Sequence, residues 1–259
     1  TVTLEGLSAK TNAASEDAAA LFAQNDGHIR VNMKGSNPGD SAVALDGNIA
    51  AKDAASRVEV GLRGEASHFK GFAYGDGTIN MWLQQGAVWQ NGKQGALWPT
   101  GFTGSHISHF VGGSETDRAG VIFQNDDKNI TIDNYHGYTK VFFAHDSVTP
   151  TNIKGGDIVI GKALGGSSIT LITDNAGLNM EASAATAEKN LVSATLNSLA
   201  NKLWYTAYTT GERSLAGKVR VNGRQTCAAR AYVELHFPLR GDCPEDAARE
   251  KAETRKSGI

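Results

Sequence analysis

Short runs of alternating apolar and polar residues recur along the chain between His28 and Gly177, and Gly, Asn and Asp residues punctuate them. Alternation with a period of two is typical of a β-strand that buries one face. Each strand is too small to bury its apolar face alone, so consecutive strands must stack into a continuous core. The pattern therefore predicts an all-β solenoid of stacked strands. The clearest runs are His28–Gly35, Arg57–Gly64, Thr78–Leu83, Asn129–Asp133, Lys140–Ala144, Asp157–Gly161 and Ser168–Thr173.

One segment follows a helical period instead of a strand period, and it covers residues 187–205. Its apolar residues recur at the intervals that place them on one stripe of a helix. A helix of this length is marginally stable alone in water, so we expect it to pack against the side or end of the stack. The stripe consists of Leu191, Val192, Leu196, Leu199, Leu203 and Trp204.

The two ends of the chain differ from the repetitive middle, which suggests three parts. Residues 1–27 are predicted to form an N-terminal cap, in which Ser15–Ala23 begins with an N-capping serine and forms one or two helical turns. Residues 28–223 are predicted to form the solenoid domain, including the helix. Residues 224–259 are richly charged and do not repeat the strand pattern, so we interpret them as an atypical C-terminal tail. Within this tail, Ala231–Phe237 is a candidate for one terminal strand.

The composition indicates a globular protein, since hydrophobic residues make up 40% and charged residues 20% of the chain. The charge is nearly balanced, with 25 Lys and Arg against 27 Asp and Glu. This balance argues against a nucleic acid or an anionic membrane as a dedicated partner. The sequence contains no uninterrupted apolar run of about 18 residues, so we expect no membrane-spanning helix in this segment.

Cysteine is confined to the C-terminal end of the chain, at Cys227 and Cys243. A long chain without cysteine fits a protein that is exported without an oxidative folding step, although a cytosolic protein can have the same composition. Two cysteines this close in sequence pair easily, but pairing also depends on the redox compartment. Whether they form a disulfide is therefore left open.

Two parts of the sequence resemble the passenger domains of autotransporters in Gram-negative bacteria. The first is Val60–Gly71 followed by Trp82–Trp89, which is similar to the L-x-G-x-x-S-x-F-x-G and L-x-x-G-A-x-W rungs of that family. The second begins with Asn129–Thr139 and continues through Ile153–Asp157 to Asn190–Tyr205. It resembles the C-terminal part of passengers, where strand-rich rungs are interrupted by a helix.

The resemblance covers about Asp46 to Val221 and implies a right-handed parallel β-helix. Passengers of this family are carried across the outer membrane by a C-terminal β-barrel and are displayed or released outside the cell. The segment Arg224–Ile259 has neither the alternating strands of about ten residues nor the aromatic girdles of such a barrel. We therefore expect a secreted or surface-displayed passenger fragment that acts as an adhesion or glycan-interaction scaffold.

An enzymatic alternative rests on a polar segment that begins at Gln124. Its carboxylates Asp126, Asp127 and Asp133 are candidates for the acid and base of a polysaccharide-active glycoside hydrolase. Adjacent strands of a stack lie about 4.8 Å apart, which is close to the carboxylate separation in retaining glycosidases. The competing interpretation is a solvated turn, because Asn and Asp favour turns. The chain carries none of the standard catalytic signatures, such as G-x-S-x-G or H-E-x-x-H, and this absence weighs against an enzyme.

Aromatic residues provide the candidates for ligand binding, because aromatic faces stack on sugar rings when they point outward. Trp98 lies in the long loop Gln90–Gly104, and Tyr135 and His136 end the polar segment. We propose these three as ligand-binding residues. Trp82 and Trp89 occupy core-like positions in the family pattern, so we assign both to the interior. The full aromatic cluster is Phe69, Phe72, Tyr74, Trp82, Trp89, Trp98 and Phe102.

The remaining expectations concern metals, cofactors and partners. His106 and His109 are three residues apart, and such residues point to opposite faces of a strand, which disfavours a shared metal. We therefore expect no metal and no cofactor. The expected partner is a cell-surface or polysaccharide ligand. An open end of the solenoid can also pair with a second copy of the chain, which suggests a homodimer.

Overall fold

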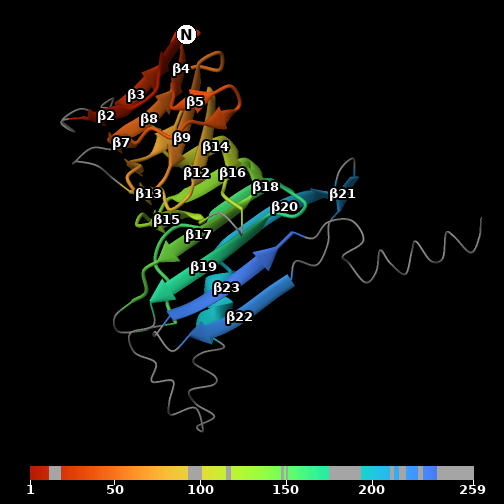
Figure 1. The fold of residues 1–259 in the computed structure, drawn as a ribbon. Coiled ribbons are helices and arrows are strands. Elements are labelled where there is room, and N and C mark those ends of the chain that lie inside the picture. The colour runs from red at the N-terminus through yellow and green to blue at the C-terminus, as the bar shows by residue number, and fades with distance from the viewer. Residues whose placement is uncertain are drawn as a thin grey trace, which may run out of the picture.

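The computed structural model describes the chain in segments, and β-strands dominate them (Figure 1). This confirms the all-β prediction. Among the described residues, one helix is present, at 194–200. The described residues are 1–11, 19–92, 101–114, 118–146, 149, 151–174, 194–210, 213–215, 220–226 and 230–237.

Two nine-stranded sheets form most of the molecule, and we call them sheet 1 and sheet 2. Sheet 1 contains, in spatial order, β1 (Val2–Leu4), β4 (His28–Val31), β9 (Arg57–Arg63), β12 (Thr78–Gln84), β14 (Gly104–Val111), β16 (Asn129–His136), β18 (Ile158–Leu164), β20 (Leu203–Thr210) and β21 (Arg213–Leu215). Sheet 2 contains β2 (Leu7–Lys10), β7 (Val43–Asp46), β10 (His68–Lys70), β13 (Val88–Asn91), β15 (Gly120–Gln124), β17 (Tyr138–Phe143), β19 (Ser168–Asp174), β23 (Arg230–His236) and β22 (Arg220–Thr226).

Two smaller sheets complete the described part of the fold. Sheet 3 consists of β3 (Ala19–Ala23), β8 (Asn48–Ala51) and β11 (Ala73–Tyr74). The strands β5 (Met33–Lys34) and β6 (Asn37–Pro38) form an antiparallel hairpin.

From β1 to β20 the chain visits the large sheets in turn, and each strand of these sheets pairs in parallel with the strand of the previous circuit. β12 pairs with β9 over its whole length, so that Ile79 lies beside Val58 and Met81 lies beside Val60. These four side chains are buried. Short strands therefore lie side by side with their buried apolar residues in register.

Sheet 3 is separate from sheet 1, and its strand β11 lies next to β14 of sheet 1. The amide of Ala73 in β11 donates a hydrogen bond to Ser105 Oγ at 3.2 Å, beside the first half of β14. The second half of β14 pairs with β12, where Phe110 lies beside Met81. β14 therefore contacts a strand of sheet 3 with its first half and a strand of sheet 1 with its second half.

The inside–outside alternation of the side chains shifts by one residue in the middle of β14, β16 and β18, and we call this position the bend. The side chains alternate between inside and outside up to Ile107 in β14, and the next inward side chain is Phe110, three residues later. The equivalent residues at the bend are Ser108, Asp133 and Gly161. The shift places His106 and His109 both outside the core, which corrects the expectation that they lie on opposite faces.

The core is a column of inward side chains that includes stacked aromatic rings. Trp89 is fully buried and stacks on Phe69 with the ring centroids 5.6 Å apart. Its indole N–H donates a hydrogen bond to the carbonyl of Gly71 at 3.0 Å. The assignment of Trp89 to the interior is thereby confirmed. The same assignment is wrong for Trp82, which is partly exposed on the outer face of sheet 1.

The N-terminal residues belong to the sheets instead of forming a separate cap. β1, β2 and β3 pair in parallel with β4, β7 and β8, so they are the first strands of the three sheets. Ala19–Ala23 is strand β3, where we expected helical turns. Residues 12–18 lie outside the described residues.

The predicted helix at 187–205 is too long at its C-terminal end. The helix ends at residue 200, and β20 begins at Leu203. Residues 187–193 lie outside the described part of the chain. Leu203 continues the apolar stripe because it points into the core from a strand, where it lies beside Ile158 of β18.

The C-terminal strands β23 and β22 extend sheet 2 beyond β19, and each pairs antiparallel with the strand before it in the sheet. β23 pairs antiparallel with β19, which confirms a strand at Ala231–Phe237. β22 continues past Arg224, the expected start of the tail, to Thr226. Phe237 is buried and its ring lies 5.5 Å from that of Tyr205. Both cysteines lie outside the described residues.

Candidate functional site

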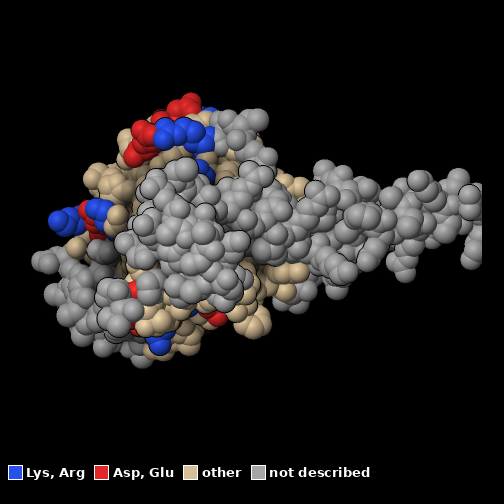
Figure 2. Space-filling view, turned by 90° about the horizontal axis from the view of Figure 1, so that it is seen from below, with Lys and Arg blue, Asp and Glu red and all other residues tan. Residues whose placement is uncertain are grey.

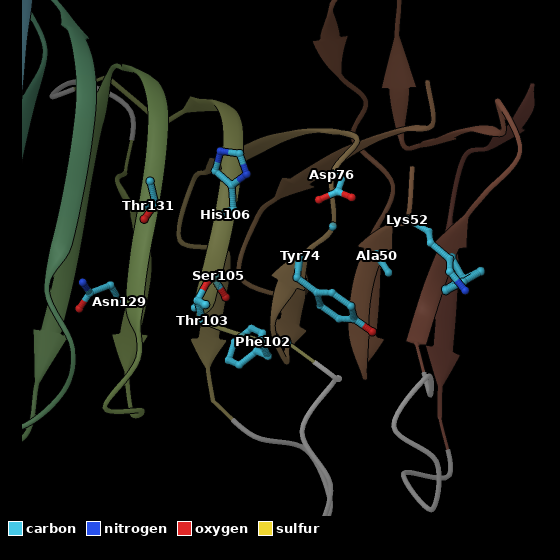
Figure 3. A pocket seen from close by; sticks show the side chains of 14 residues that line it. Ala50, Lys52, Tyr74, Asp76, Phe102, Thr103, Ser105, His106, Asn129 and Thr131 are labelled. Carbon is cyan, nitrogen blue, oxygen red and sulfur yellow. The ribbon is translucent and has the colours of Figure 1, made fainter. Parts of the chain in front are cut away.

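A groove of about 730 Å³ crosses the outer surface of sheet 3 and continues onto β14 and β16 (Figure 3). The segments that line it belong to different circuits of the stack. Its floor and walls are formed by Phe22, Ala50, Lys52, Tyr74, Gly75, Asp76, Gly101, Phe102, Thr103, Gly104, Ser105, His106, Asn129 and Thr131.

The strand register aligns the outward side chains of the groove. In sheet 3, Phe22 lies beside Ala50, and Ala50 lies beside Tyr74. Further along, His106 of β14 lies beside Thr131 of β16. Neighbouring strands lie about 4.8 Å apart, so the outward side chains recur along the groove at that spacing.

Three aromatic side chains give the groove apolar surfaces. Phe22, Tyr74 and Phe102 are each partly buried. The Tyr74 ring meets Phe102 edge-on, with centroids 6.1 Å apart, and Phe102 also packs on Phe72 at 4.4 Å. The Lys52 ammonium lies 5.8 Å from the centroid of the Phe22 ring. Their neighbours hold these rings in place while leaving part of each ring accessible.

The turn after Tyr74 depends on the absence of a side chain at Gly75. Gly75 has a φ of 123°, which favours glycine, and a Cβ there would lie only 1.9 Å from the carbonyl oxygen of Ala51. The backbone therefore passes directly against β8. This close approach sets the positions from which Tyr74 and Asp76 reach the groove.

Polar groups line the half of the groove that is formed by β14 and β16. His106 Nε2 lies 2.8 Å from Asp133 Oδ2, and both side chains are partly exposed. The carboxylate of Asp133 therefore orients the imidazole at the edge of the groove. The side chain of Asn129 accepts a hydrogen bond from the amide of Asp157 at 2.9 Å, which fixes its amide group. Thr131 adds a hydroxyl to the same wall.

The structure does not bring the three candidate catalytic carboxylates together. Asp126 and Asp127 lie in the turn between β15 and β16, where Asp126 Oδ1 accepts a hydrogen bond from the Lys128 amide at 2.8 Å. Asp133 lies four residues beyond Asn129 in β16, which corresponds to about 13 Å of strand. The turn interpretation of Asp126 and Asp127 agrees with this geometry.

Asp133 also lacks a carboxylate at the equivalent position of either neighbouring strand. Those positions are Ser108 in β14 and Gly161 in β18. Glycosidases use carboxyl groups about 5 to 9.5 Å apart. Asp126, Asp127 and Asp133 do not form such a pair by stacking on adjacent strands, so the geometry gives no support to their predicted acid and base roles.

The three ligand-binding candidates have different positions. Tyr135 is 1% exposed, stacks on Phe110 and donates its hydroxyl to the carbonyl of Ser168 at 2.6 Å, so it is a core residue. Burial raises the pKa of its hydroxyl above the ordinary range. The ligand role predicted for Tyr135 is corrected accordingly. His136 is exposed at the end of β16, and Trp98 lies outside the described residues.

Some of the residues that line the groove could be recognised as candidates from the sequence. Tyr74 and Phe102 belong to the aromatic cluster that we noted, but the sequence did not distinguish them from the buried members. Phe22, Lys52 and Asp76 were missed, because a strand pattern does not reveal which distant segments become neighbours. Thr131 carries no special signal at all.

The visible charges on the described surface are mixed. Figure 2 shows acidic and basic side chains side by side on the face seen there, with uncharged surface between them. Within the described ranges, no group of three or more His, Cys, Asp or Glu residues is placed to hold a metal ion. No helix in that part of the chain is long and apolar enough to cross a membrane.

Comparison of the chain with protein families, with curated proteins and with solved structures gives no match.

Proposed function

We propose that this chain is a right-handed parallel β-helix of the autotransporter passenger type, secreted or displayed at the cell surface as a glycan-binding adhesion scaffold. Parallel pairing of successive circuits supports the β-helix. Connections between parallel strands are right-handed in nearly all proteins, which supports the handedness. The export route rests on the sequence resemblance.

The observation that carries the binding function is the convergence of Phe22, Tyr74 and Phe102 in one groove. A sugar ring has an apolar face of C–H groups and a rim of hydroxyls, so it combines well with a partly exposed aromatic ring. The polar wall, with Asn129 and Thr131, offers donors and acceptors for the hydroxyls. Apolar surface with a few placed polar groups is the usual character of a ligand site.

The groove also suits a linear ligand better than a compact one. It spans strands of successive circuits, from β3 through β8 and β11 to β14 and β16. Its side chains recur at the spacing of the strands, which gives an extended polymer a row of contacts along the groove. We infer binding without turnover, because the described carboxylate candidates are not paired.

Replacing Tyr74 or Phe102 by alanine is expected to weaken glycan binding about fivefold, because one stacking contact is worth about 1 kcal/mol. A glycan array identifies a ligand, and titration calorimetry then compares the variants with the unmodified protein. Phe123→Ala is the matched control, since Phe123 stacks on Phe142 at 5.2 Å in sheet 2, outside the groove.

Equal affinity in the unmodified protein and both groove variants would contradict the assignment. Release of reducing sugar from the bound glycan is measured in the same samples. Turnover that disappears in Asp133→Asn would replace the scaffold by the hydrolase alternative.

A further inference from the structure

A second hollow, of about 360 Å³, lies on the outer face of sheet 1 beyond the bend in β14, β16 and β18. Three side chains that carry or can acquire positive charge line it, and we call His109, His136 and Lys162 the basic cluster. All three are exposed. The hollow has no acidic residue in its lining, which also includes Asn134 and Leu164.

The strand register brings the basic cluster together from three circuits. His109, Asn134 and Lys162 occupy equivalent positions on β14, β16 and β18. His136 lies two residues further along β16, beside Val111. At a strand spacing of about 4.8 Å, His109 and Lys162 lie on either side of Asn134, with roughly 10 Å between their strands.

The carboxylates on this face of sheet 1 already have partners. Asp133 is held by His106, and Glu59 interacts with three side chains of β4 and β9. Among the residues that the structure describes, no member of the basic cluster forms an ion pair. The protein as a whole has a net charge of -2, so this unpaired positive charge is a local feature.

We propose that the basic cluster binds an oxyanion, a carboxylate or sulfate group, on the same glycan that occupies the groove. This inference rests on the proposed glycan-binding function. β14 and β16 line both places, since His106 and Thr131 face the groove while His109 and Asn134 face the cluster. Three residues of strand span about 10 Å, so one oligosaccharide reaches from the groove to the cluster.

The chemistry of the cluster favours an anion over a neutral sugar. Lys162 supplies a permanent positive charge, and charge-assisted hydrogen bonds to oxyanions are stronger than neutral ones. The imidazoles of His109 and His136 add ring N–H donors to the same hollow. The side chains facing them from neighbouring strands are Asn80, Asn134 and Val111, none of which carries a charge.

The test measures binding of the full chain to dextran, dextran sulfate and polygalacturonate by titration calorimetry at constant ionic strength. Dextran and dextran sulfate share a backbone, and polygalacturonate separates a carboxylate from a sulfate preference. We expect at least one anionic polymer to bind about tenfold more tightly than dextran. Added salt is expected to remove this preference, since exposed charges are screened.

The variant for this test combines His109→Gln, His136→Gln and Lys162→Gln, all at exposed positions. It is expected to lose the preference for the anionic polymer. Lys140→Gln in β17 of sheet 2 is the control for a change in overall charge. Equal affinities for all three polymers, or a triple variant that keeps the preference, would overturn the oxyanion site.

The two proposals fail in different ways in this experiment. Anionic binding that depends on the basic cluster but is unchanged in Tyr74→Ala would support the oxyanion site and refute the groove. Binding that depends on Tyr74 and is indifferent to the triple substitution would support the groove and refute the oxyanion site.

Discussion

Replacement of Trp89 by alanine is expected to lower the free energy of unfolding by about 3–5 kcal/mol, the usual cost of removing a large aromatic side chain from a core. Trp89 is fully buried between consecutive circuits, beside Phe69 of β10 and Ile122 of β15. Its loss removes the stacking contact at 5.6 Å and leaves the carbonyl of Gly71 without its indole donor. The resulting cavity weakens the contact between three successive circuits.

Urea denaturation followed by circular dichroism measures this effect, because the chain contains four tryptophans and fluorescence would mix their signals. Trp82→Ala is the matched control, since it removes the same side chain from the partly exposed outer face of sheet 1. We expect its cost to stay below about 2 kcal/mol, as is usual for substitutions outside a core. Similar losses of unfolding free energy in the two variants would contradict the prediction that the buried position of Trp89 makes it more important for stability than Trp82.

The strand pattern is predictable from sequence wherever alternation is regular. Thr78–Leu83 alternates up to Met81, and β12 occupies the same residues with one more at its end. Such a run identifies its own strand because burial on one face imposes a period of two. The partners of that strand in the stack come from other circuits, which the local pattern does not contain.

The bend in β14 cannot be predicted from alternation alone, because it changes which face of the sheet each later residue occupies. A single extra residue at Ser108 moves His109 to the same side as His106. The shift occurs in a strand that contacts both sheet 3 and β12 of sheet 1, which is a tertiary feature. The C-terminal boundary of the predicted helix is wrong for a related reason. Leu203 fits the apolar stripe of a helix and an inward position in a strand equally well.

The candidate site is less predictable than the fold because its residues meet only through stacking. Phe22 and Tyr74 belong to β3 and β11, which both pair with β8. No local sequence feature joins them. Tyr135 illustrates the opposite error, since an aromatic residue in a polar segment was assigned to a ligand although the shifted alternation turns it inward.

Replacement of Glu59 by glutamine is expected to lower the free energy of unfolding by about 3 kcal/mol at neutral pH, since removing the charge from a buried ionic group leaves its partners uncompensated. Glu59 is 8% exposed. Its carboxylate accepts hydrogen bonds from Arg30 Nε at 2.8 Å and Arg57 Nη2 at 2.6 Å, and lies 3.1 Å from His28 Nε2. Glu65→Gln is the control, because Glu65 pairs with Arg118 at a well-exposed position and such pairs contribute less than about 1 kcal/mol.

The effect of Glu59 should depend on pH in a direction that follows from its surroundings. Burial alone would raise the pKa of Glu59, but the charge of Arg57 and the hydrogen bonds from His28 and Arg30 outweigh burial and lower the pKa below its ordinary value of 4.5. A carboxyl whose pKa is lower in the folded state stabilises that state above its unfolded pKa, and the stabilisation disappears as the pH falls through the folded pKa. Unfolding measured from pH 7 to 3 should therefore show a constant difference between the unmodified protein and Glu59→Gln above about pH 5, and a shrinking difference below about pH 4.5. A difference that is independent of pH would mean that Glu59 acts through packing alone.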